Sequence, residues 1–180
     1  MQTAAPQWRL TLVVGGAKSG KSRFAQQLAE TLPAPRFYVA TGEARDVEME
    51  ARIRRHQQDR GPSWQTVEEP LALGQALREA DGRGGVILVD CLTMWLSNLL
   101  AQGEAALHRE RQMLLAVLPK LMTPIILVSN EVGWGIVPAN PLARRFRDEA
   151  GLLHQELAQR AEQVVLVVCG LPLWLKRHEP

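Results

Sequence analysis

The sequence has no apolar run near the roughly 18 residues that are needed to cross a bilayer, so we expect no membrane span. Its first nine residues lack the charged segment followed by an apolar one that marks a secretory signal. The two cysteines, Cys91 and Cys169, lie outside any CxxC or Cys–His pattern. This excludes a disulfide framework and a zinc finger, and it suits a cytoplasmic protein. The near balance of 21 Lys and Arg against 19 Asp and Glu does not favour nucleic-acid binding.

The 180 residues are 46% apolar and 22% charged, which is typical of one folded domain, here residues 1–180. Short apolar runs alternate with longer amphipathic stretches. The runs consist of aliphatic and β-branched residues between Gly, Pro or Asp, as in strands that are buried on both faces. They are 8–14, 37–39, 64–67, 86–89, 125–128 and 164–168. A further run, 173–175, is expected to turn back from the sixth as an edge strand.

Parallel strands need helical connections, so we expect helices between these runs. They are 22–32, 46–60, 70–80, 91–121 with a break near Gly103, and 141–162. Phe24, Leu28 and Leu32 recur every four residues and predict one apolar face on the first helix. Pro70 is expected in the first turn of the third helix. The positions expected to face inward on the last helix are Leu142, Phe146, Leu153 and Leu157.

Together these elements predict an α/β fold, a three-layer sandwich. Its strongest motif is a loop between the first strand and the first helix, which matches G-x-x-x-x-G-K-[ST]. The loop consists of Gly15, Gly16, Ala17, Lys18, Ser19, Gly20, Lys21 and Ser22. Its glycines let backbone N–H groups point inward around an anion at a helix N-terminus. We expect Lys21 to bind the β- and γ-phosphates of a nucleoside triphosphate, and Ser22 to ligate Mg²⁺.

Two further strand ends are candidates for the same site. Asp90 ends the fourth strand and can hold Mg²⁺ through water, although such an Asp also occurs as a plain helix cap. The loop 132–140 follows the fifth strand, at the edge where α/β sheets bind ligands. Its glycines and Trp134 favour a mobile, ligand-facing segment, and the alternative is a connector with Trp134 packed down. The strand end 129–132 is not the Asn-Lys-x-Asp guanine reader of switch GTPases, and no arginine-rich lid is evident.

His56 is the candidate nucleophile. It lies in a basic stretch that is expected to be helical, where Arg52, His56 and Arg60 share one face. Neighbouring cations favour the neutral, nucleophilic imidazole, and the same arginines can neutralise a phosphate under attack. From the residues alone, a solvated surface histidine remains the alternative.

Six segments, in order, resemble the bifunctional adenosylcobinamide kinase / adenosylcobinamide-phosphate guanylyltransferase family of cobalamin biosynthesis. They are 15–22, 38–41, 51–56, 64–68, 89–93 and 129–138. The phosphate loop is common to many families, whereas the block Asn-Glu-Val-Gly-x-Gly-Ile-Val-Pro, residues 130–138, is far more specific. The similarity extends from about Leu10 to Lys176.

The resemblance implies a RecA-like P-loop NTPase fold, mostly parallel with one antiparallel C-terminal edge strand, assembled as a homotrimer. It implies that ATP or GTP first phosphorylates the aminopropanol hydroxyl of adenosylcobinamide. GTP then gives GMP to a histidine and releases pyrophosphate. The bound GMP passes to adenosylcobinamide phosphate, and the product is adenosylcobinamide-GDP.

By the same resemblance, His56 matches the guanylylated histidine and, with Lys21, is expected to be catalytic. Nucleotide-contacting positions are matched by the loop 15–22 and by Ala40, Thr41, Gly42, Gln57, Gln58, Asp59, Arg60, Glu68 and Asp90. Nothing in the sequence identifies the base for the kinase step. Two alternatives stay open, namely a RecA-type ATP switch or motor subunit, and a plain small-molecule kinase without a covalent step.

Overall fold

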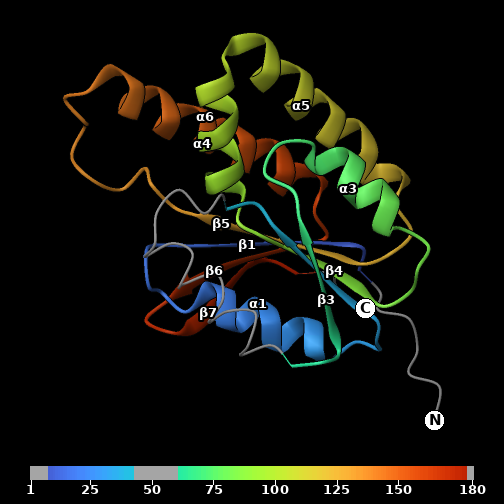
Figure 1. Ribbon diagram of the computed structural model, residues 1–180. Helices are drawn as coiled ribbons and strands as arrows, with labels where there is room; N and C mark the ends of the chain where they lie inside the picture. Colours follow the sequence, from blue (N-terminus) through green and yellow to red (C-terminus); the bar gives the residue numbers. More distant parts are fainter. Residues whose placement is uncertain (1–7, 43–60, 178–180) are drawn as a thin grey trace.

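Strands from both ends of the chain meet in one seven-stranded sheet (Figure 1). The computed structural model describes residues 8–42 and 61–177. The strands are β1 (Leu10–Gly15), β2 (Arg36–Ala40), β3 (Trp64–Glu68), β4 (Val86–Asp90), β5 (Ile125–Asn130), β6 (Gln163–Val168) and β7 (Leu171–Lys176). Their order is β3-β2-β4-β5-β1-β6-β7, and only the β6–β7 pair is antiparallel. The six expected strands and the C-terminal edge strand are confirmed.

Helices cover both faces of this sheet. They are α1 (Lys21–Glu30), α3 (Leu73–Ala80), α4 (Leu92–Gln102), α5 (Glu104–Val117) and α6 (Pro141–Arg160), with a short 3-10 helix at Leu118–Lys120. Figure 1 shows α1 on one face and α3 to α6 on the other, which confirms the three-layer sandwich. The break at Gly103 is also confirmed, with φ of 101°. The helix expected over 46–60 lies outside the described residues.

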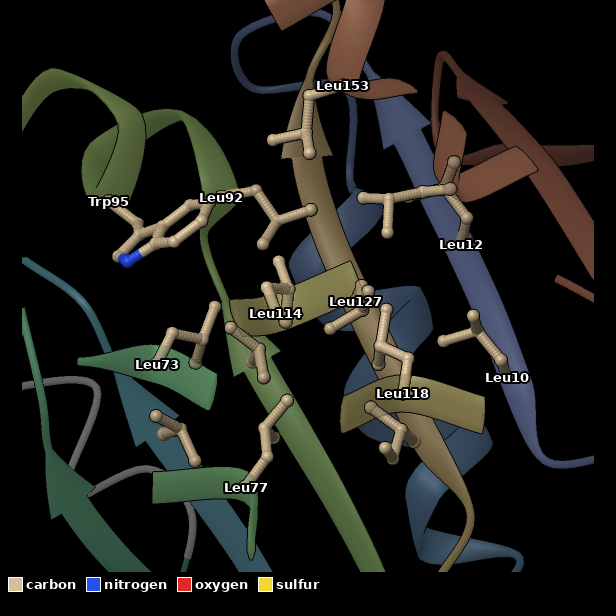
Figure 2. Close-up of a cluster of buried hydrophobic side chains, with 14 of the residues drawn as sticks. Leu10, Leu12, Leu73, Leu77, Leu92, Trp95, Leu114, Leu118, Leu127 and Leu153 are labelled. Atoms are coloured by element: carbon tan, nitrogen blue, oxygen red, sulfur yellow. The ribbon is translucent and has the colours of Figure 1, made fainter. Parts of the chain in front are cut away.

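The strands alternate between two hydrophobic clusters, as buried parallel strands do. On β4, Ile87 and Val89 belong to the cluster under α3 to α6, whereas Val86 and Leu88 belong to the cluster under α1. Figure 2 shows the first cluster, where leucines from the sheet and from the helices pack together and Trp95 lies at one side of the group. Within the described part of the chain, no helix is both long and apolar enough to cross a membrane.

Helix α1 approaches the sheet through small side chains. Its buried line consists of Lys21, Ala25 and Ala29, spaced four residues apart. Phe24 and Leu28, which were expected to form the inner face, are half-buried beside this line and pack against the cluster from the side. Because alanine keeps the helix close to the strands, the first turn of α1 is held against the sheet.

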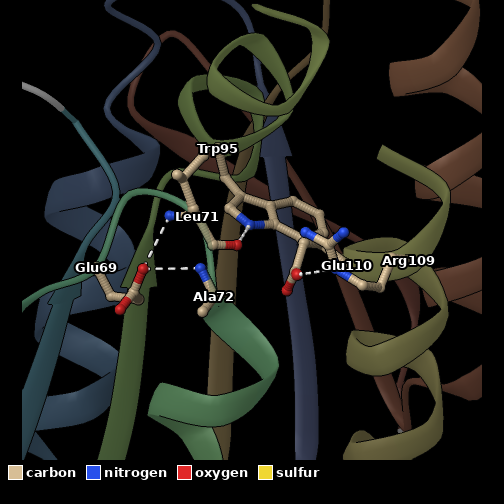
Figure 3. A network of polar contacts seen from close by, with 6 residues as sticks. All are labelled: Glu69, Leu71, Ala72, Trp95, Arg109 and Glu110. Atoms are coloured by element: carbon tan, nitrogen blue, oxygen red, sulfur yellow. Dashed lines mark hydrogen bonds and ion pairs between the residues drawn. The ribbon is translucent and has the colours of Figure 1, made fainter. Parts of the chain in front are cut away.

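Two details of the expected helices are wrong. The third helix begins at Leu73, because the Glu69 carboxylate accepts hydrogen bonds from the backbone N–H groups of Leu71 and Ala72 and holds the chain in a turn (Figure 3). Trp95 Nε1 donates to the Leu71 carbonyl at 2.7 Å and fixes the same turn. On α6, Leu142 is 60% exposed, because the first turns of this helix extend past the sheet (Figure 1). Leu153 and Leu157 are buried as expected.

Candidate nucleotide-binding site

The glycine-rich loop connects β1 to α1 at the carboxyl edge of the sheet. A Cβ at Gly15 would lie 2.6 Å from the Val167 carbonyl oxygen and 2.5 Å from Ser19 Oγ, so no larger residue fits there. Gly20 caps α1 with φ of 96°, a left-handed conformation that glycine adopts at little cost. The loop is therefore a close-fitting backbone cradle that opens the helix, as its sequence predicts.

Lys21 is buried at the base of this cradle, with 7% of its surface exposed. Its Nζ donates to the Gly16 carbonyl at 3.1 Å, across the mouth of the loop. The charge of Lys21 also lowers the pKa of the Cys91 thiol, against the larger effect of burial, which raises it. The Lys21 ammonium is therefore held at the loop itself, and its predicted contact with phosphate stays a prediction.

The β6–β7 turn supports the cradle from outside, a contact that the sequence did not reveal. Gly170 N donates to the Ser19 carbonyl at 2.8 Å. A Cβ on Gly20 would lie 3.1 Å from the Gly170 Cα, so the two backbones are in direct contact. Ser19 Oγ is buried and has no hydrogen-bond partner in the described part of the chain. The loop therefore contains a buried hydroxyl without a partner among the described residues, which fits a site for a polar ligand.

Three other candidate residues lie level with one another at the carboxyl edge. The strand register aligns Glu68 with Ala40 and Ala40 with Asp90. Asp90 is half-buried and Glu68 is exposed. The structure thus brings the ends of β3, β2 and β4 into one row, and the nucleotide contacts of these residues stay a prediction.

Thr41 joins two of these strand ends. It is fully buried, and its hydroxyl donates to the Cys91 carbonyl at 2.7 Å and accepts from Cys91 N at 3.0 Å. Its own carbonyl accepts from Asn98 Nδ2 at 2.8 Å. The Thr41 side chain therefore holds the end of β4 in place, and its nucleotide contact stays a prediction. Gly42, the neighbouring candidate, is half-buried.

Cys91 is a packed thiol beside this row. Burial, together with the charge of Asp90, raises the pKa of Cys91. Its sulfur lies 3.2 Å from Thr93 Oγ1, which in turn accepts from Asn130 Nδ2 at 2.7 Å. These contacts join the end of β4 to the end of β5, in agreement with the interpretation of Cys91 as a buried filler.

A second polar group lies where β5 ends and was not recognised in the sequence as a unit. Ser129 is fully buried, and its Oγ lies 2.6 Å from His154 Nε2 on α6. His154 Nδ1 lies 3.9 Å from Glu131 Oε2. Burial lowers the pKa of His154, and the charge of Glu131 offsets this only in part, so the imidazole is neutral at pH 7. No local sequence signal pairs these residues, because His154 comes from a distant helix.

The loop after β5 presents apolar side chains to solvent. Trp134 is 76% exposed, so the alternative of a connector with a packed tryptophan is wrong. The loop ends in ordered contacts, because Arg144 Nη1 donates to the carbonyls of Pro138 and Ala139 at 2.9 and 2.7 Å. Asn140 caps α6 through hydrogen bonds from Leu142 N and Ala143 N.

The residues predicted to hold Mg²⁺ fit a hard cation. The Ser22 hydroxyl lies in the first turn of α1, which packs on β4, and Asp90 ends that strand. Both are oxygen donors, as Mg²⁺ prefers, and they leave positions for phosphate oxygens and water. In residues 8–42 and 61–177, no group of three or more His, Cys, Asp and Glu is placed to hold a metal by protein ligands alone. The predicted residues His56, Gln57, Gln58, Asp59 and Arg60 lie outside the described part.

A backbone cradle between a parallel strand and a helix, faced by a carboxylate on a second strand, defines a P-loop NTPase-like protein. Solved structures of other proteins support this fold, and they support nothing beyond the fold. An ATPase from the type III secretion system of pathogenic bacteria matches with a TM-score of 0.54 and 12% identity, over 92% of this chain and 56% of that one. A protein from Pyrococcus horikoshii OT3 matches with a TM-score of 0.54 and 8% identity, over 95% and 87%.

Within this class, residues 11–175 match the family described as cobinamide kinase / cobinamide phosphate guanyltransferase, and the chain belongs to this family. It is 50% identical over 166 residues to the bifunctional adenosylcobalamin biosynthesis protein CobP of Pseudomonas aeruginosa. This match covers 92% of this chain and 96% of CobP. It is 39% identical over 181 residues to CobU of Escherichia coli K12, over 93% and 99%. The resemblance seen in the sequence is confirmed, and the chain is an enzyme rather than an ATP switch.

Proposed function

We propose that this enzyme first transfers the γ-phosphoryl group of ATP or GTP to the aminopropanol hydroxyl of adenosylcobinamide. It then transfers GMP from GTP to adenosylcobinamide phosphate, and the product is adenosylcobinamide-GDP. Membership of the kinase and guanyltransferase family supports this pair of reactions. The cradle between β1 and α1, with Lys21 at its base, is the structural observation that carries the proposal.

In both reactions the cradle holds the triphosphate. Backbone N–H groups of residues 16–22 bind phosphate oxygens, and the orphaned Ser19 hydroxyl donates to one of them. Lys21 releases the Gly16 carbonyl and stabilises the negative charge that grows on the leaving group. The site excludes water from this charge, because Lys21 is buried beneath the loop.

Ser22 and Asp90 are the residues that would hold Mg²⁺. The ion would supply charge neutralisation between the phosphates. Thr41 and Asn98 contribute indirectly, because their hydrogen bonds keep the β4 end, and hence Asp90, in place.

For the second reaction we propose a covalent step on His56. A ring nitrogen attacks the α-phosphorus of GTP, a P–N bond forms, and pyrophosphate leaves with the electron pair of the broken P–O bond. A phosphate oxygen of adenosylcobinamide phosphate then attacks the same phosphorus, and the P–N electrons return to the ring. Two displacements replace one difficult displacement. The support for His56 is the match of its segment to the family, and the arginines around it favour a neutral ring.

Three wider expectations belong to the same proposal. We propose a single domain over residues 1–180, a cytoplasmic location and a homotrimer with sites near the subunit boundaries. The exposed leucines of β7, namely Leu171, Leu173 and Leu175, support assembly, because an apolar face on an edge strand is costly to leave in water. Light scattering of the purified protein measures the oligomeric state, and a monomer would contradict the trimer.

The experiment that tests the covalent step is incubation with α-labelled GTP, followed by denaturation. We expect acid-labile, alkali-stable label on the protein, with one GMP per chain by intact mass. His56→Asn should abolish the label, whereas His108→Asn, at an exposed histidine on α5, should retain it. Lys21→Ala should lose both the label and the kinase activity, because both reactions use the cradle. If the wild-type protein phosphorylates cobinamide and takes no label, the guanyltransferase half is wrong and a plain kinase remains.

A further inference from the structure

The kinase reaction proposed above needs a base that removes the proton from the substrate hydroxyl, and no residue has yet been assigned to this role. This inference rests on that proposed reaction. Such a base must lie beside the γ-phosphate, within hydrogen-bond reach of the attacking oxygen. Carboxylates at the carboxyl edge of the sheet are the candidates. In the part of the chain that the structure describes, Glu68, Glu69, Asp90 and Glu131 end or follow strands of this edge. The Glu69 carboxylate already accepts from the backbone N–H groups of Leu71 and Ala72.

Their distances from the cradle differ. Neighbouring strands are about 4.8 Å apart, so the strand that carries Glu68 lies about 19 Å from β1. Asp90 ends β4, the second strand from β1, and is assigned to the metal. Glu131 follows β5, which lies between β1 and β4 and pairs directly with β1. Its position is therefore between the cradle and Asp90.

Glu131 is also bonded to the loop itself. Its backbone N–H donates to the Gly15 carbonyl at 2.9 Å, at the first residue of the cradle. The preceding residue, Asn130, is level with Gly15 in the strand register. The backbone of Glu131 therefore cannot move independently of the phosphate loop.

The carboxylate is held at one oxygen. Oε1 accepts from Gly133 N at 2.7 Å, and a Cβ at Gly133 would lie 2.9 Å from this oxygen, so glycine there leaves room for the contact. Oε2 faces His154 Nδ1 at 3.9 Å, beyond hydrogen-bond distance. The described residues provide no lysine or arginine that forms an ion pair with Glu131. Its side chain is 24% exposed, which leaves access from solvent.

We propose that Glu131 is the general base of the kinase step. Its Oε2 accepts the hydroxyl proton of the alcohol substrate while that oxygen attacks the γ-phosphorus. The new P–O bond forms, the bond to the β–γ bridging oxygen breaks, and the nucleoside diphosphate leaves with its electrons. The carboxyl group then releases the proton to water. His154 Nδ1 lies 3.9 Å from the same Oε2 and borders the position of the carboxylate.

The decisive variant is Glu131→Gln, because glutamine keeps the Oε1 acceptor and the shape but cannot take a proton. We expect the kinase kcat for cobinamide to fall by about 100-fold or more, in the range for loss of a general base. The KM for the nucleotide, the melting temperature and the guanylyl label from GTP should remain at wild-type values. Glu131→Asp should retain part of the kcat, since it keeps a carboxylate. Glu79→Gln, on the exposed side of α3, is the matched control and should behave as wild type.

Three outcomes overturn the proposal. A kinase kcat within about threefold of wild type in Glu131→Gln shows that this carboxylate is not the base. Loss of the guanylyl label together with the kinase activity shows that Glu131 supports the cradle for both reactions instead. A wild-type protein that does not phosphorylate cobinamide removes the kinase step itself, and this failure of the proposed function is visible in the wild-type arm alone.

Discussion

The two faces of the sheet are packed in different ways. Under α3 to α6, large leucines and Trp95 fill a thick layer. Under α1, the contact consists of Ala25 and Ala29 and the edges of half-buried side chains. The thick layer supplies most of the buried apolar area, whereas the thin layer places the start of one helix close to the strand ends. Phosphate binding depends on this close approach of helix and strands, because the cradle is made of backbone at the start of α1.

The largest effect is expected in the thick layer. Trp95→Ala removes a fully buried indole and the hydrogen bond to the Leu71 carbonyl, and we expect the free energy of unfolding to fall by about 3–5 kcal/mol. Trp134→Ala, at an exposed tryptophan, should change it by less than about 0.5 kcal/mol. Urea unfolding of the two variants measures the difference. Equal losses would show that the thick layer is not the main source of stability.

A smaller loss in the free energy of unfolding is expected for a substitution under α1, where little room separates the helix from the sheet. Ala25→Leu places a larger side chain between the helix and the sheet, and we expect a loss of about 1–3 kcal/mol. Gln27→Leu, on the exposed side of the same helix, is the control and should stay within about 0.5 kcal/mol of wild type. Denaturant melts report both values. A neutral or stabilising Ala25→Leu would mean that α1 is loosely packed, and the comparison of the faces would fail.

The smallest effect concerns His154, a half-buried polar residue on α6. Because burial lowers its pKa from 6.5 in the folded state, protonation is easier in the unfolded chain. The contribution to stability is complete above pH 6.5 and is lost as the pH falls through the folded pKa. From pH 7 to 5.5 we expect wild type to lose at most about 1 kcal/mol more than His154→Gln. His108→Gln should follow wild type, and parallel curves for His154→Gln and wild type would contradict the assignment.

The sequence predicted the local elements well. Each buried strand was visible as a short aliphatic run, and the phosphate loop as a motif, because both depend on contiguous residues. Gly15 and Gly20 were assigned for backbone freedom, and the structure adds that their hydrogens also make room for Val167 and Gly170. The start of α3 was placed too early, because Glu69 holds the preceding turn through side-chain contacts that propensity does not describe.

What the sequence determined by itself is the strands and helices of the described residues, the cradle and the family, since burial periodicity, backbone sterics and motif order act within short segments. Only the tertiary structure decided which segments meet at the site. It placed β5 between β1 and β4, Gly170 against the cradle and His154 beside Glu131. These residues are far apart in the chain, and their contacts follow from how the helices and strands pack on one another, which no local pattern encodes.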